Sequence, residues 1–209
     1  MPDMSVEFAS LLCSRLCHDL MSPVGSMSNG LELLADEDDP EMRARCMELL
    51  ADSARASADR LKFFRLAFGA GGGFGDAVPA AELKAAIEGL LRGNKRIQLG
   101  WLVEAPTIEK TAAKILLNLG MIGIDALARG GRLDVGAENG EVVVRAEGTR
   151  LTLDAEVRSV LAGAADDGAM SARTSGAWLV RRLAEAEGGR IELADHEQGV
   201  LLLAGFLPG

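Results

Sequence analysis

The chain has 209 residues, of which 48% are hydrophobic and 25% charged, and its formal net charge is −9. That length and hydrophobic content allow one or two compact domains, while the acidic balance argues against nucleic acid and anionic membranes as partners, because both require a basic face. Since no signal-peptide pattern and no apolar run long enough to span a membrane are present, we expect a cytoplasmic protein.

The first predicted element is one amphipathic helix over residues 8–34, because apolar side chains recur there at steps of three or four. These apolar positions are Phe8, Leu12, Leu16, Leu20, Val24, Met27, Leu31 and Leu34. His18 falls on the opposite face of that helix. Its neighbours on the face are small or polar, namely Ser14, Ser22, Gly25 and Asn29. The imidazole is therefore expected to stand in a shallow, open surface, with Pro23 kinking the helix one turn later.

A second helix is predicted over residues 41–68, after an acidic stretch that ends in Pro40. The short turn between the two helices predicts an antiparallel hairpin. One hairpin cannot bury the full apolar stripe of both helices. We therefore expect two hairpins to dimerise into a four-helix bundle, the alternative being that the rest of the chain covers the stripe.

A glycine-rich run, residues 69–75, follows the hairpin. A phosphate-binding loop is one interpretation, but no Gly-Lys-Ser/Thr follows and the run leaves a helix rather than a strand. A flexible linker is therefore predicted. The sequence divides into a helical domain (1–68), a linker (69–78) and a second domain (79–209).

The second domain alternates helical and strand patterns, which predicts an α/β sandwich with helices on one face of a sheet. The predicted helices cover residues 79–92, 107–129, 154–161 and 175–187. The predicted strands are 97–103, a hairpin over 132–147 and a closing hairpin made of 190–195 and 200–207. Two local signals are specific, the Asn139-Gly140 turn and Asp154 as a helix cap. The fold class is thus α+β.

The three cysteines, Cys13, Cys17 and Cys46, are an odd number and lack the spacing of a disulfide framework, so reduced thiols are expected. A zinc site needs further ligands, and the second histidine, His196, lies far along the chain. We expect no metal site.

Residues 18–24, HDLMSPV, resemble the phospho-acceptor box of histidine-kinase dimerisation helices, in which His is followed by an acid, an apolar residue, two variable residues and Pro. The second domain resembles the ATP-binding Bergerat domain of histidine kinases in the order of its elements. The similar stretches are residues 115–119, 131–135, 178–192 and 198–208.

The positions that contact ATP in those kinases are altered here. Asn118 is followed, four residues on, by Ile122 where the kinases have the asparagine that holds magnesium. Ala146 stands in place of the acid that reads adenine, and Arg150 in place of a glycine of the same box. The phosphate box keeps only Gly176. This pattern predicts a retained fold without ATP binding, so no cofactor is expected on this chain.

An acceptor histidine in a helical hairpin, followed by a degenerate ATPase-like domain, resembles the ChpT-type histidine phosphotransferases of alphaproteobacteria. The resemblance implies a dimeric relay that takes a phosphoryl group from the receiver domain of a hybrid histidine kinase and passes it to response-regulator receiver domains in cell-cycle control. Magnesium is expected on the partner receiver. Two alternatives remain open: a divergent but ATP-active histidine or serine kinase, and a non-catalytic dimeric scaffold with His18 incidental.

His18 is the predicted acceptor, because neutral imidazole is a good nucleophile and its reference pKa is about 6.5. Asp19 is expected to orient or polarise the ring, the alternative being a solvated helix acid. Arg15 is expected to meet the phosphoryl group or an acid of the receiver, or else to form a surface salt bridge. The partner-binding face comprises Arg15, Ser14, Ser22, Gly25 and Asn29. His196 is the rival acceptor, in a hairpin turn without a kinase-like box.

Overall fold

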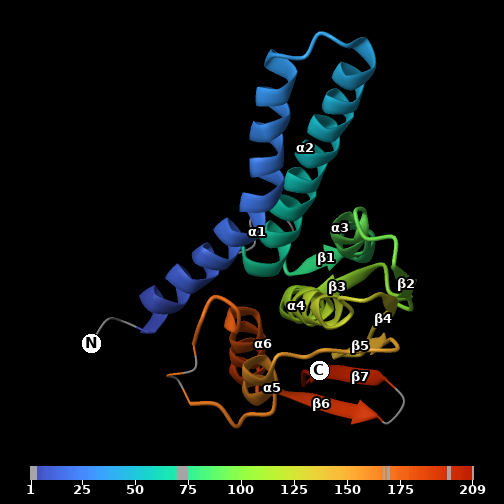
Figure 1. Cartoon of the computed structure of the whole chain (residues 1–209). Coiled ribbons are helices and arrows are strands. Elements are labelled where there is room, and N and C mark those ends of the chain that lie inside the picture. Colours follow the sequence, from blue (N-terminus) through green and yellow to red (C-terminus); the bar gives the residue numbers. More distant parts are fainter. Residues whose placement is uncertain (1–3, 70–74, 167, 169, 197–198, 209) are drawn as a thin grey trace.

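The structure is a computed structural model that describes residues 4–69, 75–166, 168, 170–196 and 199–208. Two long helices come first and a mixed α/β region follows (Figure 1). This confirms the predicted α+β class, with a helical hairpin followed by an α/β sandwich. Within these described ranges, no helix is both long and apolar enough to cross a membrane. The glycine run at 70–74, the centre of the predicted linker, lies outside the described residues.

Helices α1 (Met4–Ala35) and α2 (Pro40–Phe68) form the hairpin. The turn between them ends at Asp39, whose carboxylate accepts a hydrogen bond from the Glu41 backbone N–H at 3.3 Å. Pro40 follows in the first turn of α2, where its missing N–H removes no intrahelical bond. These local features place the turn where the sequence predicts it.

Helix α1 remains helical through Pro23 but changes direction along its length (Figure 1). Proline removes one intrahelical hydrogen bond and its ring presses on the preceding turn, which accounts for the bend. Because of the bend, the N-terminal part of α1 leaves the hairpin and lies beside α6 (Ser175–Ala186). Phe8 and Leu16 pack there against the core of the C-terminal region.

A five-stranded sheet of order β2-β4-β5-β7-β6 supports the C-terminal region. Strand β2 (Ile97–Trp101) is parallel to β4 (Gly131–Glu138), and the other pairs are antiparallel. The remaining strands are β5 (Glu141–Glu147), β6 (Arg190–His196) and β7 (Val200–Phe206). Asn139 and Gly140 form the β4–β5 turn with φ of 49° and 81°, as a two-residue hairpin turn requires.

Helix α4 (Lys110–Ala126) is the centre of the hydrophobic core. It contacts β4, β5 and β7 of the sheet, and α2 and α6 on its other sides. Its side chains are therefore buried almost all round, as the apolar sequence predicts. The shorter helices α3 (Ala80–Leu91) and α5 (Ala155–Leu161) complete the region.

The core continues from the C-terminal region into the hairpin. Phe63, Phe64 and Ala67 of α2 are buried in the same cluster as the side chains of α4. The Asn118 side-chain amide on α4 also donates to the Ala67 carbonyl at 3.2 Å. The end of α2 is therefore fixed against α4 by both packing and a hydrogen bond.

The start of the predicted helix 107–129 is wrong. Thr107–Glu109 form strand β3, which pairs antiparallel with β1 (Ala77–Pro79). Helix α4 begins only at Lys110, where the Glu109 carboxylate accepts hydrogen bonds from the next backbone N–H groups. Strand β1 takes the last residues of the predicted linker. The local pattern does not reveal this pair because the two strands are short and lie far apart in sequence.

Candidate functional site

His18 stands on an open face of α1, with its side chain 83% exposed. The residues predicted to flank it are all exposed, namely Ser14, Ser22, Gly25 and Asn29. A Cβ atom added to Gly25 would meet nothing within 4 Å. The predicted shallow surface is thus present, and the roles of these residues toward a partner remain predictions.

Asp19 holds the ring of His18 in one orientation. The Nδ1 atom of His18 lies 3.0 Å from Asp19 Oδ1. An ionised carboxylate can only accept hydrogen bonds, so Nδ1 carries the proton in this pair. The lone pair of the neutral ring is then on Nε2. The geometry therefore leaves a nucleophilic nitrogen on an exposed side chain.

Arg15 connects Asp19 to α4. Its Nε donates to Asp19 Oδ2 at 2.7 Å, and its Nη2 donates to Asp125 Oδ2 at 3.2 Å. The Arg15 side chain is only 16% exposed. Of the two predicted roles for Arg15, the structure contains the salt bridge, made with acids of its own chain.

Burial and the neighbouring charges shift the pKa values of Arg15 and Asp125. Desolvation lowers the pKa of Arg15, but the hydrogen bond to Asp19 and the charge of Asp125 outweigh it, so the pKa is raised. Desolvation between α1 and α4 raises the pKa of Asp125, and the positive charge of Arg15 opposes that rise. The Asp125 side chain is nevertheless 60% exposed, so it is solvated on one side and desolvated on the other.

A cavity of about 720 Å³ lies beneath His18, between α1 and the C-terminal region. It is lined by α1, by the second half of α4, by the segment that leads into α5 and by the start of α6. The lining residues are Ser14, Arg15, His18, Asp19, Met121, Ile122, Asp125, Ala126, Ala128, Thr152, Leu153, Asp154, Val157, Ala172, Arg173 and Gly176. We call this cavity the His18 groove.

Comparison with known proteins places this geometry in a family. Residues 80–199 match the model of the histidine phosphotransferase C-terminal domain. The curated "Protein phosphotransferase ChpT" of Brucella abortus (strain 2308) is 34% identical over 208 residues, which is 96% of each chain. The chain belongs to the histidine phosphotransferase family. A solved bacterial phosphotransferase superposes with a TM-score of 0.83 at 30% identity, covering 96% of both chains.

Membership of this family confirms the predicted phosphotransferase activity and the predicted place in a phosphorelay. The non-catalytic scaffold is therefore set aside. The family model covers residues 80–199, so His18 on α1 lies outside it, whereas the matches to ChpT and to the solved phosphotransferase each cover 96% of the chain. The assignment of His18 thus depends on the geometry described above and on the resemblance of its sequence.

Some of the positions aligned with the ATP boxes of histidine kinases line the His18 groove, and others do not. Ile122 and Gly176 both line the His18 groove, and Ile122 offers no ligand atom. Ala146 lies on β5 and is fully buried, whereas Arg150 is exposed and does not line the groove. Asp125 and Asp154, which also line the groove, are each paired with an arginine.

Sequence reasoning missed Asp125, Asp154 and Arg173 as groove residues. Asp154 is predicted only as a helix cap, and its carboxylate does accept from the Glu156 and Val157 backbone N–H groups. It also pairs with Arg173 at 2.8 Å; this hydrogen bond, and then the backbone bonds, lower the pKa of Asp154. Asp125 has one signal in the sequence: it is the single acid of a largely apolar helix.

The cysteines are not among the residues that line the groove, and the rival acceptor has no described side chain. His196 ends β6, and its side chain lies outside the part of the chain that the structure describes. Cys13 and Cys17 are exposed on α1, and Cys46 is buried on α2; all three are free thiols. The described residues contain no group of three or more His, Cys, Asp or Glu side chains that could hold a metal ion.

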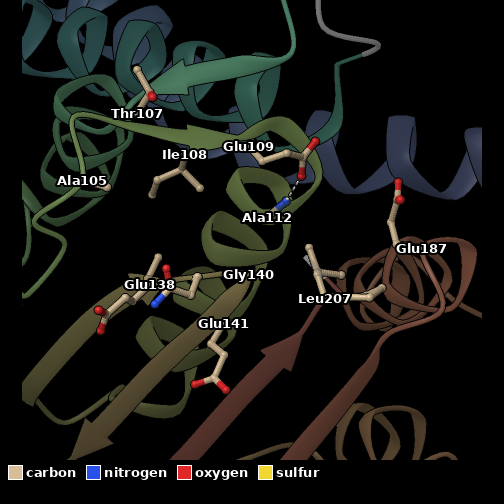
Figure 2. Close-up of a pocket in the computed structure, with 13 residues that line it drawn as sticks. Ala105, Thr107, Ile108, Glu109, Ala112, Glu138, Gly140, Glu141, Glu187 and Leu207 are labelled. Carbon is tan, nitrogen blue, oxygen red and sulfur yellow. Dashed lines mark hydrogen bonds between the residues drawn. The ribbon is translucent and has the colours of Figure 1, made fainter.

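A second cavity, of about 470 Å³, lies between β3, the β4–β5 turn and the end of α6 (Figure 2). Figure 2 shows that carboxylates, including Glu138, Glu141 and Glu187, surround it together with apolar side chains such as Ile108. None of its lining residues is on α1. It is therefore separate from the His18 groove.

Proposed function

We propose that His18 carries the phosphoryl group between receiver domains. The observation that supports this most directly is the 3.0 Å bond between His18 Nδ1 and Asp19 Oδ1, on an imidazole that is 83% exposed. That bond selects the tautomer with a free Nε2 lone pair, and the exposure gives a second protein access to it. His18 is then the nucleophile and Asp19 its positioning residue.

The transfer consists of two displacements at phosphorus. In the first, the Nε2 lone pair attacks the aspartyl phosphate of the donor receiver, an N–P bond forms, and the P–O bond breaks with its electron pair leaving on the aspartate. The ring keeps its Nδ1 proton and becomes cationic, and the Asp19 carboxylate stabilises that charge. In the second, an aspartate of the next receiver attacks and His18 leaves as neutral imidazole.

Positioning and charge stabilisation do most of the work in such transfers. We propose that the receiver supplies magnesium to neutralise the phosphoryl oxygens, because the described residues of this chain present no cluster of metal ligands. The face formed by Ser14, Ser22, Gly25 and Asn29 would accommodate the receiver, since these side chains are short or absent and exposed.

We propose that the protein acts as a homodimer. Most large apolar side chains that are exposed in the described chain lie on the hairpin: Val6, Met21, Val24, Leu31, Leu33, Met42, Met47, Leu49 and Leu61. A monomer rarely leaves so many on two neighbouring helices. A second hairpin would bury them in a four-helix bundle.

We also propose that the chain does not bind ATP. Ile122 lacks an oxygen for magnesium, and the fully buried Ala146 has no carboxylate for adenine. The Arg15–Asp125 ion pair closes one side of the groove with α1. The phosphoryl group would therefore come from a receiver domain and not from nucleotide.

The resemblance of the sequence to the ChpT-type phosphotransferases supports the more specific proposals. The donor is the receiver domain of a hybrid histidine kinase, and the acceptors are response-regulator receivers that control the cell cycle. The protein would act in the cytoplasm.

The proposal is tested by mixing the chain with a receiver that carries labelled aspartyl phosphate. Wild type should acquire label that is lost in acid and survives alkali, and should pass it to a second receiver. His18→Gln keeps an exposed polar side chain, so the fold should persist while label uptake is lost. His196→Gln is the control and should take up label normally. Uptake by His18→Gln at the wild-type rate would refute the proposal.

A further inference from the structure

Four charged or polar side chains form a continuous series of contacts from helix α4 to the acceptor. Asp125 contacts Arg15 at 3.2 Å, Arg15 contacts Asp19 at 2.7 Å, and Asp19 contacts His18 at 3.0 Å. Only Asp125 lies outside α1. It stands on α4, which is fixed by burial along its length, so it is the anchor of the series.

The two oxygens of Asp19 have different partners, and so do the two nitrogens of Arg15. Asp19 Oδ2 accepts from Arg15 Nε, and Asp19 Oδ1 is paired with His18 Nδ1. Arg15 directs its Nη2 away from Asp19, to Asp125 Oδ2. A guanidinium readily binds both oxygens of one carboxylate through two parallel N–H groups. Here Nη2, the nitrogen that would supply the second of those bonds, donates to Asp125 Oδ2.

We propose that Asp125 is a positioning residue for phosphoryl transfer: by holding the Nη2 of Arg15, it prevents Arg15 from taking both oxygens of Asp19, and so reserves Oδ1 for His18. This inference rests on the proposed role of His18. Helix α4, which carries Ile122, would then also help to orient His18 through Asp125.

The experiment compares Asp125→Ala with wild type in two measurements. The first is the tautomer of His18 in the unphosphorylated protein, from the ¹⁵N chemical shifts of its ring. The second is the rate of label uptake from a phosphorylated receiver. Asp125→Ala should lower the fraction of the Nδ1–H tautomer and slow uptake about two- to fivefold, the size expected for loss of one partly exposed ion pair. The affinity for the unphosphorylated receiver should not change.

Three further variants separate positioning from charge or packing. Asp125→Glu keeps a carboxylate and should restore most of the rate. Arg15→Lys keeps the charge but has a single terminal nitrogen that cannot serve two carboxylates as the fork does, so it should slow uptake at least as much as Asp125→Ala. Glu88→Ala removes a similarly exposed acid from its pair with Lys84 on α3 and should leave the rate and the tautomer unchanged.

The inference is overturned if Asp125→Ala leaves the tautomer unchanged, or if Glu88→Ala slows uptake equally, since surface charge alone would then explain the effect. Failure of the proposed function looks different, because wild type would then take up no label on His18. The tautomer is measured on unphosphorylated protein, so that measurement tests the role of Asp125 even if wild type takes up no label.

Discussion

Gly25 provides a quantitative test of the open face on which His18 stands. It lies in the interior of α1, and a Cβ placed on it would meet no atom within 4 Å. Glycine in an exposed helix interior is about 0.8–1 kcal/mol less favourable than alanine. Because nothing in the chain opposes the added methyl group, Gly25→Ala should stabilise the protein by about that amount and raise Tm by about 2–4 °C.

Gly30, on the same helix, is the matched control. It is buried, and its Cβ would lie 3.1 Å from Leu50 Cδ2 on α2. The same gain in helix propensity is then opposed by overpacking, which costs about 1–3 kcal/mol. Gly30→Ala should therefore range from neutral to about 2 kcal/mol less stable than wild type.

Both variants are to be unfolded by urea at one protein concentration, because the stability of the proposed dimer would depend on concentration. Label uptake from a phosphorylated receiver is measured in parallel, and Gly25→Ala should retain it because a methyl group is small. If Gly25→Ala is less stable than wild type, or gains no more than Gly30→Ala, the face around His18 is covered and the reasoning is wrong.

Three further predictions concern assembly, nucleotide and acid stability. Light scattering at micromolar concentration should give twice the 22.0 kDa chain mass, and a monomer would contradict the four-helix bundle. Calorimetric titration with ATP and magnesium should be flat to millimolar ligand, whereas saturable micromolar binding would support a kinase. The pKa of Asp154 is lowered by Arg173 and by the backbone N–H of Glu156, so its stabilisation is present above the unfolded pKa and is lost as pH falls through the folded one. Asp154→Ala should therefore cost about 1 kcal/mol at neutral pH, and the difference from wild type should shrink progressively as the pH falls below the unfolded pKa of about 3.9 and through the lower folded one, while Asp154→Asn should retain part of the cap without that pH dependence.

Elements with a local physical cause were predictable from the sequence. The Asn139-Gly140 turn needs positive φ at both residues, and the pair is suited to it. The Asp154 cap is a side chain bonding to its own next turn. The β1–β3 pair was missed because its stability comes from pairing between segments distant in sequence, which no local pattern encodes.

In the candidate site, too, features that depend on one helix were predictable and contacts between helices were not. The open face around His18 follows from helical periodicity on one element, and the structure contains it. The contact of Arg15 with Asp125 joins α1 to α4 and depends on how α1 bends at Pro23 and packs, so spacing along the chain could not reveal it. The sequence did offer both a salt bridge and a partner contact for Arg15, and only the packed structure shows which acids lie within its reach.

The continuous core gives the C-terminal region a role in folding that is independent of any ligand. Phe63 and Phe64 of the hairpin are 0% and 3% exposed because that region covers them. Exposing such side chains costs about 1.5–3 kcal/mol each, a large share of the roughly 5–15 kcal/mol that holds a typical domain folded. A chain cut after Phe68 would lose this cover together with the Asn118 bond to Ala67. The C-terminal region therefore stabilises the helical hairpin that carries His18, and this role depends on buried side chains and not on the residues that line its surface.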